Sequence, residues 1–269
     1  MKIFLHKKKL IQTLERENNL GFVPTMGAIH QGHISLIKKS IKQCHKTIVT
    51  IFINKGQFNR KSDYLSYPRF VKKDIKKLKK LKIDYLYLPT NNQIYPNGQN
   101  KKIIISPFAK KLCGKSRPGH FKAVIDVIDR FIKIIKPQRI FLGKKDMQQL
   151  KIIEHFIKKN KIKTKVIACK TIREKNGIAC SSRNILLNDK EKIIASKIYN
   201  LINKNKSKII KNKLKISKIK KRFYNLGANK IDYIKIFDIN KIVKPFTKSK
   251  NYRIFVAYYL GSTRLIDNI

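Results

Sequence analysis

Segments typical of buried strands alternate with segments typical of helices through the first two-thirds of the chain. The strand-like segments are continuous runs of β-branched and aromatic residues, which indicate strands covered on both faces. Repeated strand–helix–strand units predict an α/β fold with a Rossmann-like, doubly wound parallel sheet that binds ligands at the carboxyl ends of its strands. The expected strands are 21–23, 47–53, 85–88, 139–142 and 164–168, and the expected helices begin near 34 and cover 72–81, 124–135 and 147–159.

The character of the chain changes near Thr171. A loop at 171–184 leads into a lysine-rich helical stretch at 189–226, and strand-like segments follow at 232–236 and 252–259. This mixture indicates a smaller α+β unit. We therefore expect a Rossmann-like catalytic domain at residues 1–172 and a C-terminal α+β domain at residues 173–269 that forms a lid over the ligand site.

The chain is strongly basic, with 64 Lys and Arg against 15 Asp and Glu and a net charge of +49. Lysines are spread along almost the whole chain, whereas nucleic-acid-binding proteins more often concentrate charge on one face or tail. Lys, Ile and Asn are abundant and Trp is absent. Since those three have AT-rich codons, we interpret the charge as drift in an AT-rich genome and expect nucleic-acid binding to be at most incidental.

Cysteine usage and apolar patterning bear on the cellular compartment. Cys44, Cys113, Cys169 and Cys180 form no Cys-x-x-Cys pair, and we expect them to stay reduced in a cytosol. The apolar segment at the first residues is too short for a signal-peptide core, and no apolar run in the sequence approaches about 18 residues. A cytoplasmic protein without a membrane segment is therefore expected.

The turn at 24–33 is the strongest functional motif. It follows a short apolar run and leads into a helical pattern, and Gly27 and Gly32 allow the backbone to approach a ligand closely. A helix N-terminus offers unpaired N–H groups to phosphate oxygens. His30 and His33, three apart on a helix, are expected on one face with their Cβ atoms roughly 5–6 Å apart. The pattern predicts a nucleotide phosphate site.

Two other interpretations of the histidine pair compete with this one. A zinc site of this kind would use His-Glu-x-x-His spacing and a further ligand. Here the spacing is i, i+3, and no acidic residue lies between the histidines. A purely structural pair is the second alternative. Donation to developing phosphate charge is the interpretation that we favour over both.

Five further segments accompany the histidine turn in the order in which a known enzyme family carries them. Together the six segments resemble the pantothenate synthetase (pantoate–β-alanine ligase) family, of the His-x-Gly-His nucleotidyltransferase superfamily. The resemblance runs nearly end to end, to the closing segment at 260–268. The five segments are 52–58, 63–69 with Asp74 beyond it, 114–121, 141–150 and 173–184.

The resemblance implies a two-step reaction. The pantoate carboxylate attacks the α-phosphate of ATP to give pantoyl adenylate and pyrophosphate, and the β-alanine amine then releases pantothenate and AMP. It also implies ATP as substrate, Mg²⁺ as cofactor and a homodimer formed through the first domain. The alternatives are another adenylate-forming member of the superfamily, or a nucleic-acid-binding protein on a retired scaffold.

The resemblance also implies residue roles. His33, as proton donor, His30 and Lys145 would be catalytic, and Asp146 would bind the ribose or help to hold Mg²⁺. Gln57 and Gln149 would bind pantoate, because an amide both donates to a carboxylate and accepts from hydroxyls, and Asn54 and Arg117 would orient substrate. The ATP site would consist of Met26, Gly27, Ala28, Ile29, His30, Gln31, Gly32, His33, Gly143, Lys144, Lys145, Asp146, Ile172, Cys180, Ser181, Ser182 and Arg183.

Four positions depart from the family pattern. Lys55 stands where proline is usual, which predicts a looser turn around Gln57. Ala123 replaces a glycine, Asp126 replaces a small hydroxyl residue and Cys180 replaces an apolar residue. None of these removes a group that does chemistry, so we expect activity, with weaker binding and lower stability.

Overall fold

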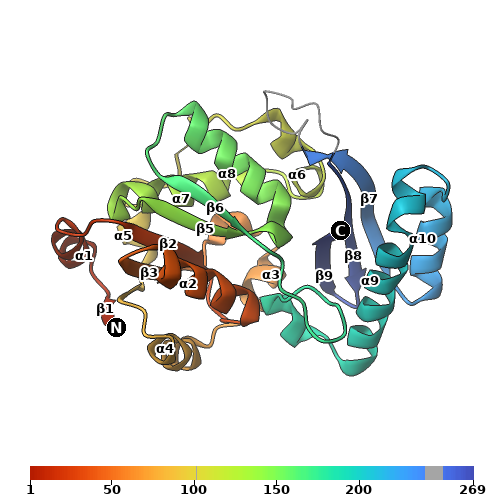
Figure 1. Cartoon of the computed structure of the whole chain (residues 1–269), viewed down its shortest axis with the longest axis horizontal. Helices are drawn as coiled ribbons and strands as arrows, with labels where there is room; N and C mark the ends of the chain where they lie inside the picture. The colour runs from red at the N-terminus through yellow and green to blue at the C-terminus, as the bar shows by residue number, and fades with distance from the viewer. Residues whose placement is uncertain (101, 240–250) are drawn as a thin grey trace.

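The computed structural model describes residues 1–100, 102–239 and 251–269, which contain two sheets (Figure 1). All pairs in the six-stranded sheet are parallel, in the order β1-β4-β3-β2-β5-β6. Its strands are β1 (Lys2–Phe4), β2 (Leu20–Thr25), β3 (Lys46–Ile51), β4 (Tyr85–Tyr87), β5 (Arg139–Gly143) and β6 (Lys165–Cys169). The predicted doubly wound α/β fold is confirmed.

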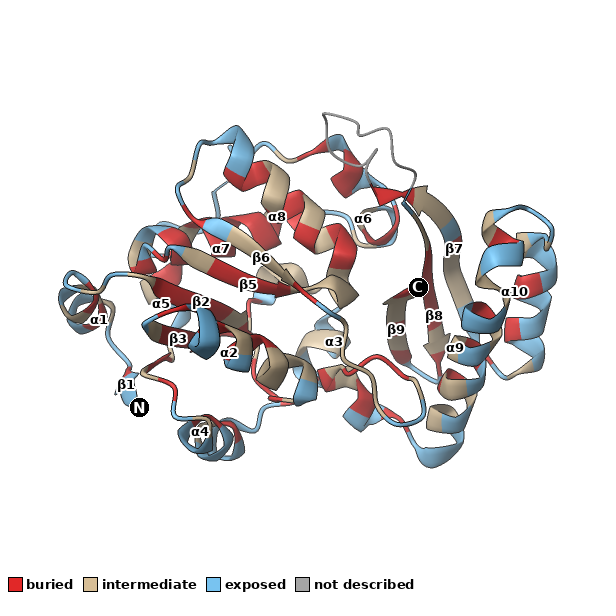
Figure 2. Ribbon diagram, in the orientation of Figure 1, coloured by how far each residue is buried: buried red, intermediate tan, exposed pale blue. Residues whose placement is uncertain are grey.

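Helices cover both faces of this sheet because successive strand residues point to opposite sides. Phe22 packs in the core beside α1, α7 and α8, whereas Val23 packs in the core beside α2 and α4. The central strands are accordingly buried along their length (Figure 2). The α-helices of this part are α1 (Lys7–Leu14), α2 (Gln31–Gln43), α3 (Lys61–Leu65), α4 (Val71–Lys80), α5 (Asn91–Ile94), α6 (Cys113–Ser116), α7 (His120–Ile135) and α8 (Met147–Lys159).

The strand order changes direction at β2. From β2 the chain proceeds to β3 and then β4 on one side, and it later returns to place β5 on the other side of β2. Connections that leave in opposite directions open a crevice at the carboxyl ends of the two strands. The histidine turn follows β2, and the short 3₁₀ helix η3 (Lys144–Asp146) follows β5. The topology therefore brings these two motifs together.

The C-terminal part forms a three-stranded antiparallel sheet of β7 (Lys230–Asp238), β8 (Tyr252–Leu260) and β9 (Thr263–Asn268). The predicted helical stretch consists of two helices, α9 (Asp189–Ile210) and α10 (Ile216–Asn225). Asn188 and Glu191 form a capping box at the start of α9. The helices cover one face of this sheet, and the opposite face is turned toward the parallel sheet (Figure 1).

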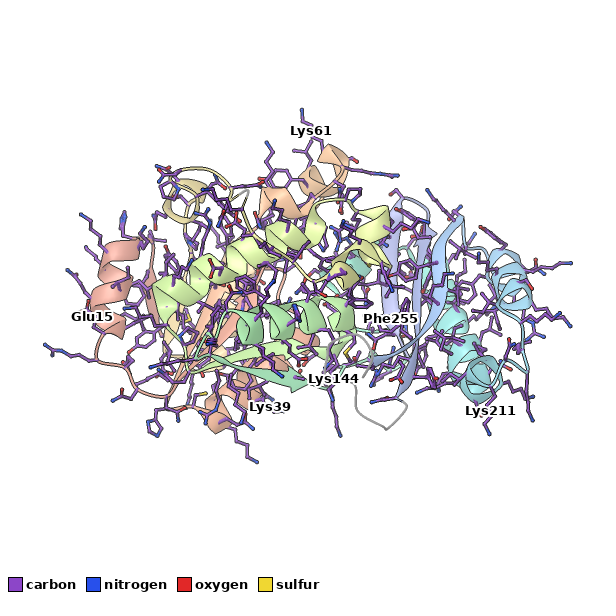
Figure 3. All side chains as sticks on the ribbon, turned by 90° about the horizontal axis from the view of Figure 1, so that it is seen from above. Glu15, Lys39, Lys61, Lys144, Lys211 and Phe255 are labelled. Atoms are coloured by element: carbon purple, nitrogen blue, oxygen red, sulfur yellow. The ribbon has the colours of Figure 1, made fainter. Side chains whose placement is uncertain are left out.

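Lysine side chains project from all parts of the molecule. Lys61 and Lys211 lie far apart in the view, Lys39 and Lys144 lie nearer each other on α2 and η3, and other cationic side chains extend around the outline (Figure 3). The structure thus agrees with the sequence in distributing the positive charge rather than gathering it on one face. None of the helices in the described ranges combines the length and the apolar character that crossing a membrane requires.

Candidate active site

A cavity of about 300 Å³ lies at the carboxyl ends of β2 and β5 and extends to the C-terminal sheet. Most of the predicted site residues are brought together there. Those that line it are Met26, His30, Gly32, His33, Gln57, Arg117, Gly143, Lys145, Asp146, Gln149, Ile172, Cys180, Ser181, Ser182 and Arg183. Gly27, Ala28, Ile29, Gln31, Lys144 and Asn54 are not among its lining residues.

His30 lies before helix α2 and not within its first turn, which corrects the expected geometry of the histidine pair. Helix α2 begins at Gln31, and the His30 Nδ1 atom caps it by accepting a hydrogen bond from the Gly32 N–H at 3.1 Å. The His30 and His33 rings stack with centroids 3.9 Å apart. A Cβ on Gly32 would lie 2.7 Å from the His30 ring, so the close packing requires glycine here.

Asp74 holds the backbone of the histidine turn. Ala28 has a left-handed φ of 49°, a conformation that costs roughly 1–2 kcal/mol for a residue with a Cβ. The buried Asp74 carboxylate accepts from the Ala28 and Ile29 N–H groups, both at 2.8 Å. Lys77, one turn further along α4, donates to the Ile29 carbonyl at 2.6 Å. Helix α4 thereby fixes the strained turn that carries His30.

Both histidines of the site are neutral at pH 7. Burial, together with the positive charge of Lys145, lowers the pKa of His30 to about 4. Burial, with His30 and Lys145 nearby, holds the pKa of His33 well below its usual range. Because the His30 Nδ1 atom accepts from Gly32, the ring proton lies on Nε2 and is free to donate. The buried His33 Nδ1 atom has no hydrogen-bond partner within the described part of the chain.

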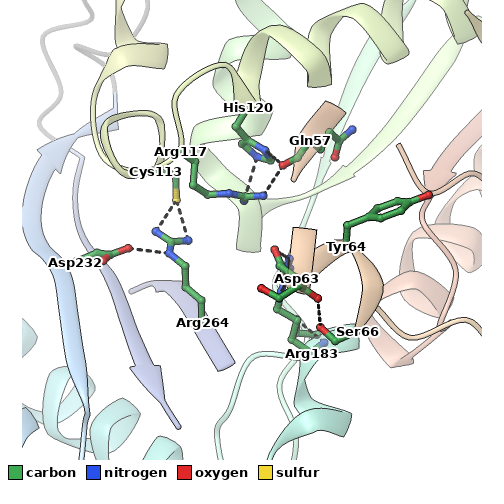
Figure 4. Close-up of polar contacts among 12 residues, drawn as sticks. Gln57, Asp63, Tyr64, Ser66, Cys113, Arg117, His120, Arg183, Asp232 and Arg264 are labelled. Atoms are coloured by element: carbon green, nitrogen blue, oxygen red, sulfur yellow. Dashed lines mark hydrogen bonds and ion pairs between the residues drawn. The ribbon is translucent and has the colours of Figure 1, made fainter. Parts of the chain in front are cut away.

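The backbone at Gln57 is held by Arg117, which follows α6, and by His120, the first residue of α7. Arg117 Nη2 donates to the Gln57 carbonyl oxygen at 2.7 Å, and His120 Nδ1 lies 2.8 Å from the same oxygen (Figure 4). Burial lowers the pKa of Arg117 to about 10, and burial beside Arg117 lowers the pKa of His120 to about 3. A neutral His120 donates its Nδ1 proton to this carbonyl. These two bonds fix the turn that includes Lys55, at which the sequence predicts looseness.

The buried histidines predict acid sensitivity of the fold. In the unfolded chain a histidine takes up its proton near pH 6.5, whereas folded His120, with its pKa of about 3, does so only in stronger acid. Between these values the unfolded state binds more protons, so the free energy of unfolding falls as pH falls below about 6.5. Urea unfolding between about pH 5 and pH 7.5 measures this slope. His120→Asn, which keeps a donor toward Gln57, flattens it.

The matched control for this experiment is His45→Asn, which replaces an exposed imidazole. We expect this variant to keep the slope of the parent protein. An unchanged slope in His120→Asn would contradict the assignment of His120 as a buried neutral group.

Residues 181–183 are packed against the histidine turn. Ser182 is buried, and its hydroxyl lies 3.4 and 3.3 Å from the carbonyl oxygens of Gly27 and Ala28. Arg183 Nη2 contacts both carboxylate oxygens of Asp63 at 3.0 Å, which links this loop to helix α3 (Figure 4). Burial raises the pKa of the neighbouring Cys180 thiol, so it lines the cavity in its neutral form.

Asn54 and Asp126 have structural partners outside the cavity lining. Asn54 is buried, and its side-chain amide donates to the Ala123 carbonyl at 3.1 Å. Asp126 is also buried, accepts from the Asn100 N–H and pairs with Arg130 at 2.6 Å. The Ala123 and Asp126 departures therefore affect the packing of α7 rather than the cavity surface.

Sequence reasoning did not assign roles to three residues that build the site. Asp74 lies in a lysine-rich helix that resembles a solvated surface, and only its position in the fold shows that it is buried. The same is true of the contacts that Lys77 and Asp63 make. In the described residues, no group of three or more His, Cys, Asp or Glu side chains is placed to hold a metal ion.

Comparison with known proteins gives the family. The sequence profile described as Pantoate-beta-alanine ligase matches residues 2–269. The chain belongs to this family. A pantothenate synthetase of Thermodesulfovibrio yellowstonii is 38% identical over 256 residues, which cover 93% of this chain and 91% of the relative. One of Francisella tularensis subsp. mediasiatica is 39% identical over 257 residues, covering 95% and 91%.

Solved structures of pantoate–β-alanine ligases share the fold over the whole chain. The pantothenate synthetase of Thermus thermophilus superposes with a TM-score of 0.89 at 27% identity and covers 100% of this chain and 99% of its own. The Francisella tularensis ligase has a TM-score of 0.87 at 36% identity, with coverage of 100% and 97%. That ligase is described as complexed with beta-gamma ATP and beta-alanine.

Proposed function

We propose that this protein joins (R)-pantoate to β-alanine in an ATP-dependent reaction that yields pantothenate, AMP and pyrophosphate. The observation that carries the proposal is the half-buried, stacked pair of neutral histidines beside Lys145, at the crevice of a fold that matches the ligase family from residue 2 to 269. The match to relatives over more than nine-tenths of their length supports the same activity.

In the first step, a pantoate carboxylate oxygen attacks the α-phosphorus of ATP. A new P–O bond forms, the bond to the bridging oxygen breaks, and pyrophosphate leaves with the electron pair. His30 and His33 donate hydrogen bonds to the phosphate oxygens, and Lys145 stabilises the growing negative charge. The negative charge of bound ATP raises the pKa of His33, which brings it toward a form able to protonate the leaving oxygen.

In the second step, the β-alanine amine attacks the acyl carbon of pantoyl adenylate. A C–N bond forms, the acyl C–O bond to the phosphate breaks, AMP leaves with the electron pair, and the amine proton passes to solvent. Gln57 and Gln149 bind pantoate through amides that pair with its carboxylate and hydroxyls, and Arg117 orients the carboxylate of β-alanine. The half-buried Gln149 and the fixed backbone of Gln57 support these roles. Asn54 acts from behind this surface by positioning the first turn of α7.

ATP occupies the crevice between the two motifs. We assign it to the backbone of residues 26–33, to residues 143–146 with Ile172, and to the loop at 180–183, which closes on the phosphates. Mg²⁺ usually binds through one or two carboxylates together with substrate phosphates. Asp146, half-exposed at the cavity, fits that use and would hold the ion that neutralises the phosphate charge.

The larger organisation is also part of the proposal. We place the domain boundary near residue 172, with residues 1–172 as the catalytic domain and 173–269 as the lid. The separate core formed by α9, α10 and the antiparallel sheet supports this division. A cytoplasmic homodimer formed through the first domain completes the proposal, and any contact with nucleic acid is incidental to it.

An omission assay tests the reaction. Release of AMP and pyrophosphate is measured with ATP, pantoate and β-alanine, and then with each substrate left out in turn. Formation of pantothenate that requires all three, and that is lost in His33→Ala and Gln149→Ala, supports the ligase. Absence of product from folded protein, together with RNA binding that survives physiological salt, would show a scaffold with another use.

A further inference from the structure

The side chain of Asn268 connects the C-terminal sheet to the turn that carries Lys145. Asn268 lies at the end of β9 and is 2% exposed. Its Nδ2 atom donates to the carbonyl oxygens of Lys144 at 2.9 Å and Lys145 at 2.7 Å. Both amide hydrogens are therefore used on two successive residues of η3.

The orientation of this amide is fixed by its third contact. Arg253 Nη1 donates to Asn268 Oδ1 at 2.9 Å. Because a guanidinium has no acceptor, the amide oxygen must face Arg253 and the nitrogen must face the two carbonyls. The opposite orientation would place donor against donor at Arg253 and acceptor against acceptor at η3. Every polar atom of the Asn268 amide thus has a hydrogen-bond partner, and only one orientation of the amide allows this.

Strand alternation explains why β9 reaches both parts of the molecule. Arg264, Ile266 and Asn268 lie on one face, and Ile266 packs against the core of the parallel sheet. Leu265, on the other face, packs into the core with α9 and α10. At the opposite end of the first face, Arg264 reaches Ser116 Oγ at 3.1 Å. This face of β9 therefore contacts the N-terminal part of the chain through Asn268 at one end and Arg264 at the other.

Lys145 lies in the short turn that Asn268 contacts. Its backbone is part of a single 3₁₀ turn, a short element with little rigidity of its own. Its ammonium lies 3.3 Å from the Asp146 carboxylate, close enough to His30 and His33 to lower the pKa of both. A small rotation of η3 would move the cation away from the phosphate position.

We propose that Asn268 is a positioning residue, which holds Lys145 at the reacting phosphate by clamping the two carbonyls of η3. The proposal rests on the ligase function proposed above and adds a residue that acts through Lys145 rather than on substrate. On this proposal the C-terminal sheet contributes to catalysis, because a side chain of β9 sets the position of the Lys145 ammonium.

A double-mutant cycle tests the proposal. Asn268→Asp replaces the donor by an acceptor of equal size while keeping the contact with Arg253. We expect it to lower kcat about 10- to 30-fold, as for a misplaced electrostatic group. In the Lys145→Ala background, the same change should lower kcat by less than about 2-fold, because groups that act as a unit are not additive.

Controls separate this role from a general loss of structure. Asn229→Asp makes the same chemical change at an exposed side chain that accepts from the Gly261 N–H, and it should leave kcat unchanged. Asn268→Ala removes the donor without adding charge. It is the variant to measure if Asn268→Asp does not fold. Equal losses of kcat in the parent and Lys145→Ala backgrounds would overturn the proposal, as would parental kcat in both Asn268 variants.

The affinity for ATP, measured by calorimetric titration, tests the role of Asn268 separately from the proposed ligase function. Asn268→Asp should bind ATP about 5- to 10-fold more weakly than the parent, and should add nothing in the Lys145→Ala background. This result supports the clamp even if the ligase assay shows no pantothenate. Parental ATP affinity in Asn268→Asp would overturn the clamp while leaving the ligase function intact.

Discussion

His33→Ala lowers the rate of pantothenate formation by about 10²- to 10³-fold, the usual loss when one preorganised donor is removed from developing charge. The imidazole is half-buried, neutral and stacked on His30 at 3.9 Å, and its buried Nδ1 atom has no partner within the described residues. The ring lines the cavity, where it can meet a bound substrate. The effect should lie mainly in kcat, because the charge that it stabilises grows in the transition state.

Two variants control this measurement. His33→Asn retains a neutral amide donor and should recover part of the lost rate. His45→Ala removes an exposed imidazole beyond the far end of α2 and should not change the rate. A His33→Ala protein that keeps its fold and its kcat would contradict the role of His33 in the first step.

Asp74→Ala destabilises the fold and impairs catalysis together. Its carboxylate is the partner of two buried N–H groups, those of Ala28 and Ile29. Leaving two buried donors unpaired costs about 2–5 kcal/mol in free energy of unfolding. The turn then keeps its contacts with Lys77 and Ser182, through carbonyl oxygens, but the displacement of His30 should lower kcat about 10- to 100-fold.

Urea unfolding and steady-state kinetics measure the two effects of Asp74→Ala. Asp74→Asn keeps one acceptor oxygen and should lie between the parent and the alanine variant in both. Lys76→Ala, on the exposed face of the same helix, is the matched control and should change neither. Loss of stability without loss of kcat would show that the turn keeps its shape without α4.

The sequence predicts five of the six strands of the parallel sheet because they contain apolar runs, and it misses the edge strand β1, which has only three residues. The helix predicted at 147–159 has the same bounds as α8, and the predicted strand 139–142 is extended only by Gly143. Strand β9 is missed. Its apolar residues alternate between two hydrophobic cores, but polar residues at 263, 264, 267 and 268 leave too few of them to form a recognisable strand pattern. Helix α7 begins at His120, four residues before the predicted start, after Gly119 in a left-handed conformation.

Site residues can be predicted where they belong to a sequence motif typical of a reaction. They cannot be predicted where their role depends on their position in the folded structure. His30, His33, Lys145 and Gln149 all line one cavity, as their motifs predict. Asn54 is predicted to orient substrate, but the structure places its amide on the Ala123 carbonyl behind the cavity surface. The contact between an asparagine of β9 and the Lys145 turn joins segments more than 120 residues apart, which no local pattern encodes.

Helix α4, which fixes the histidine turn, buries few side chains of its own. Only Asp74 and Leu78 among its ten residues are buried. Its lysines repeat at i, i+4, as at Lys72 and Lys76, and so repel one another. Fraying of this helix would release the Ala28 and Ile29 N–H groups from Asp74. We therefore expect anions that screen these lysines to stabilise α4, and with it the turn that carries His30.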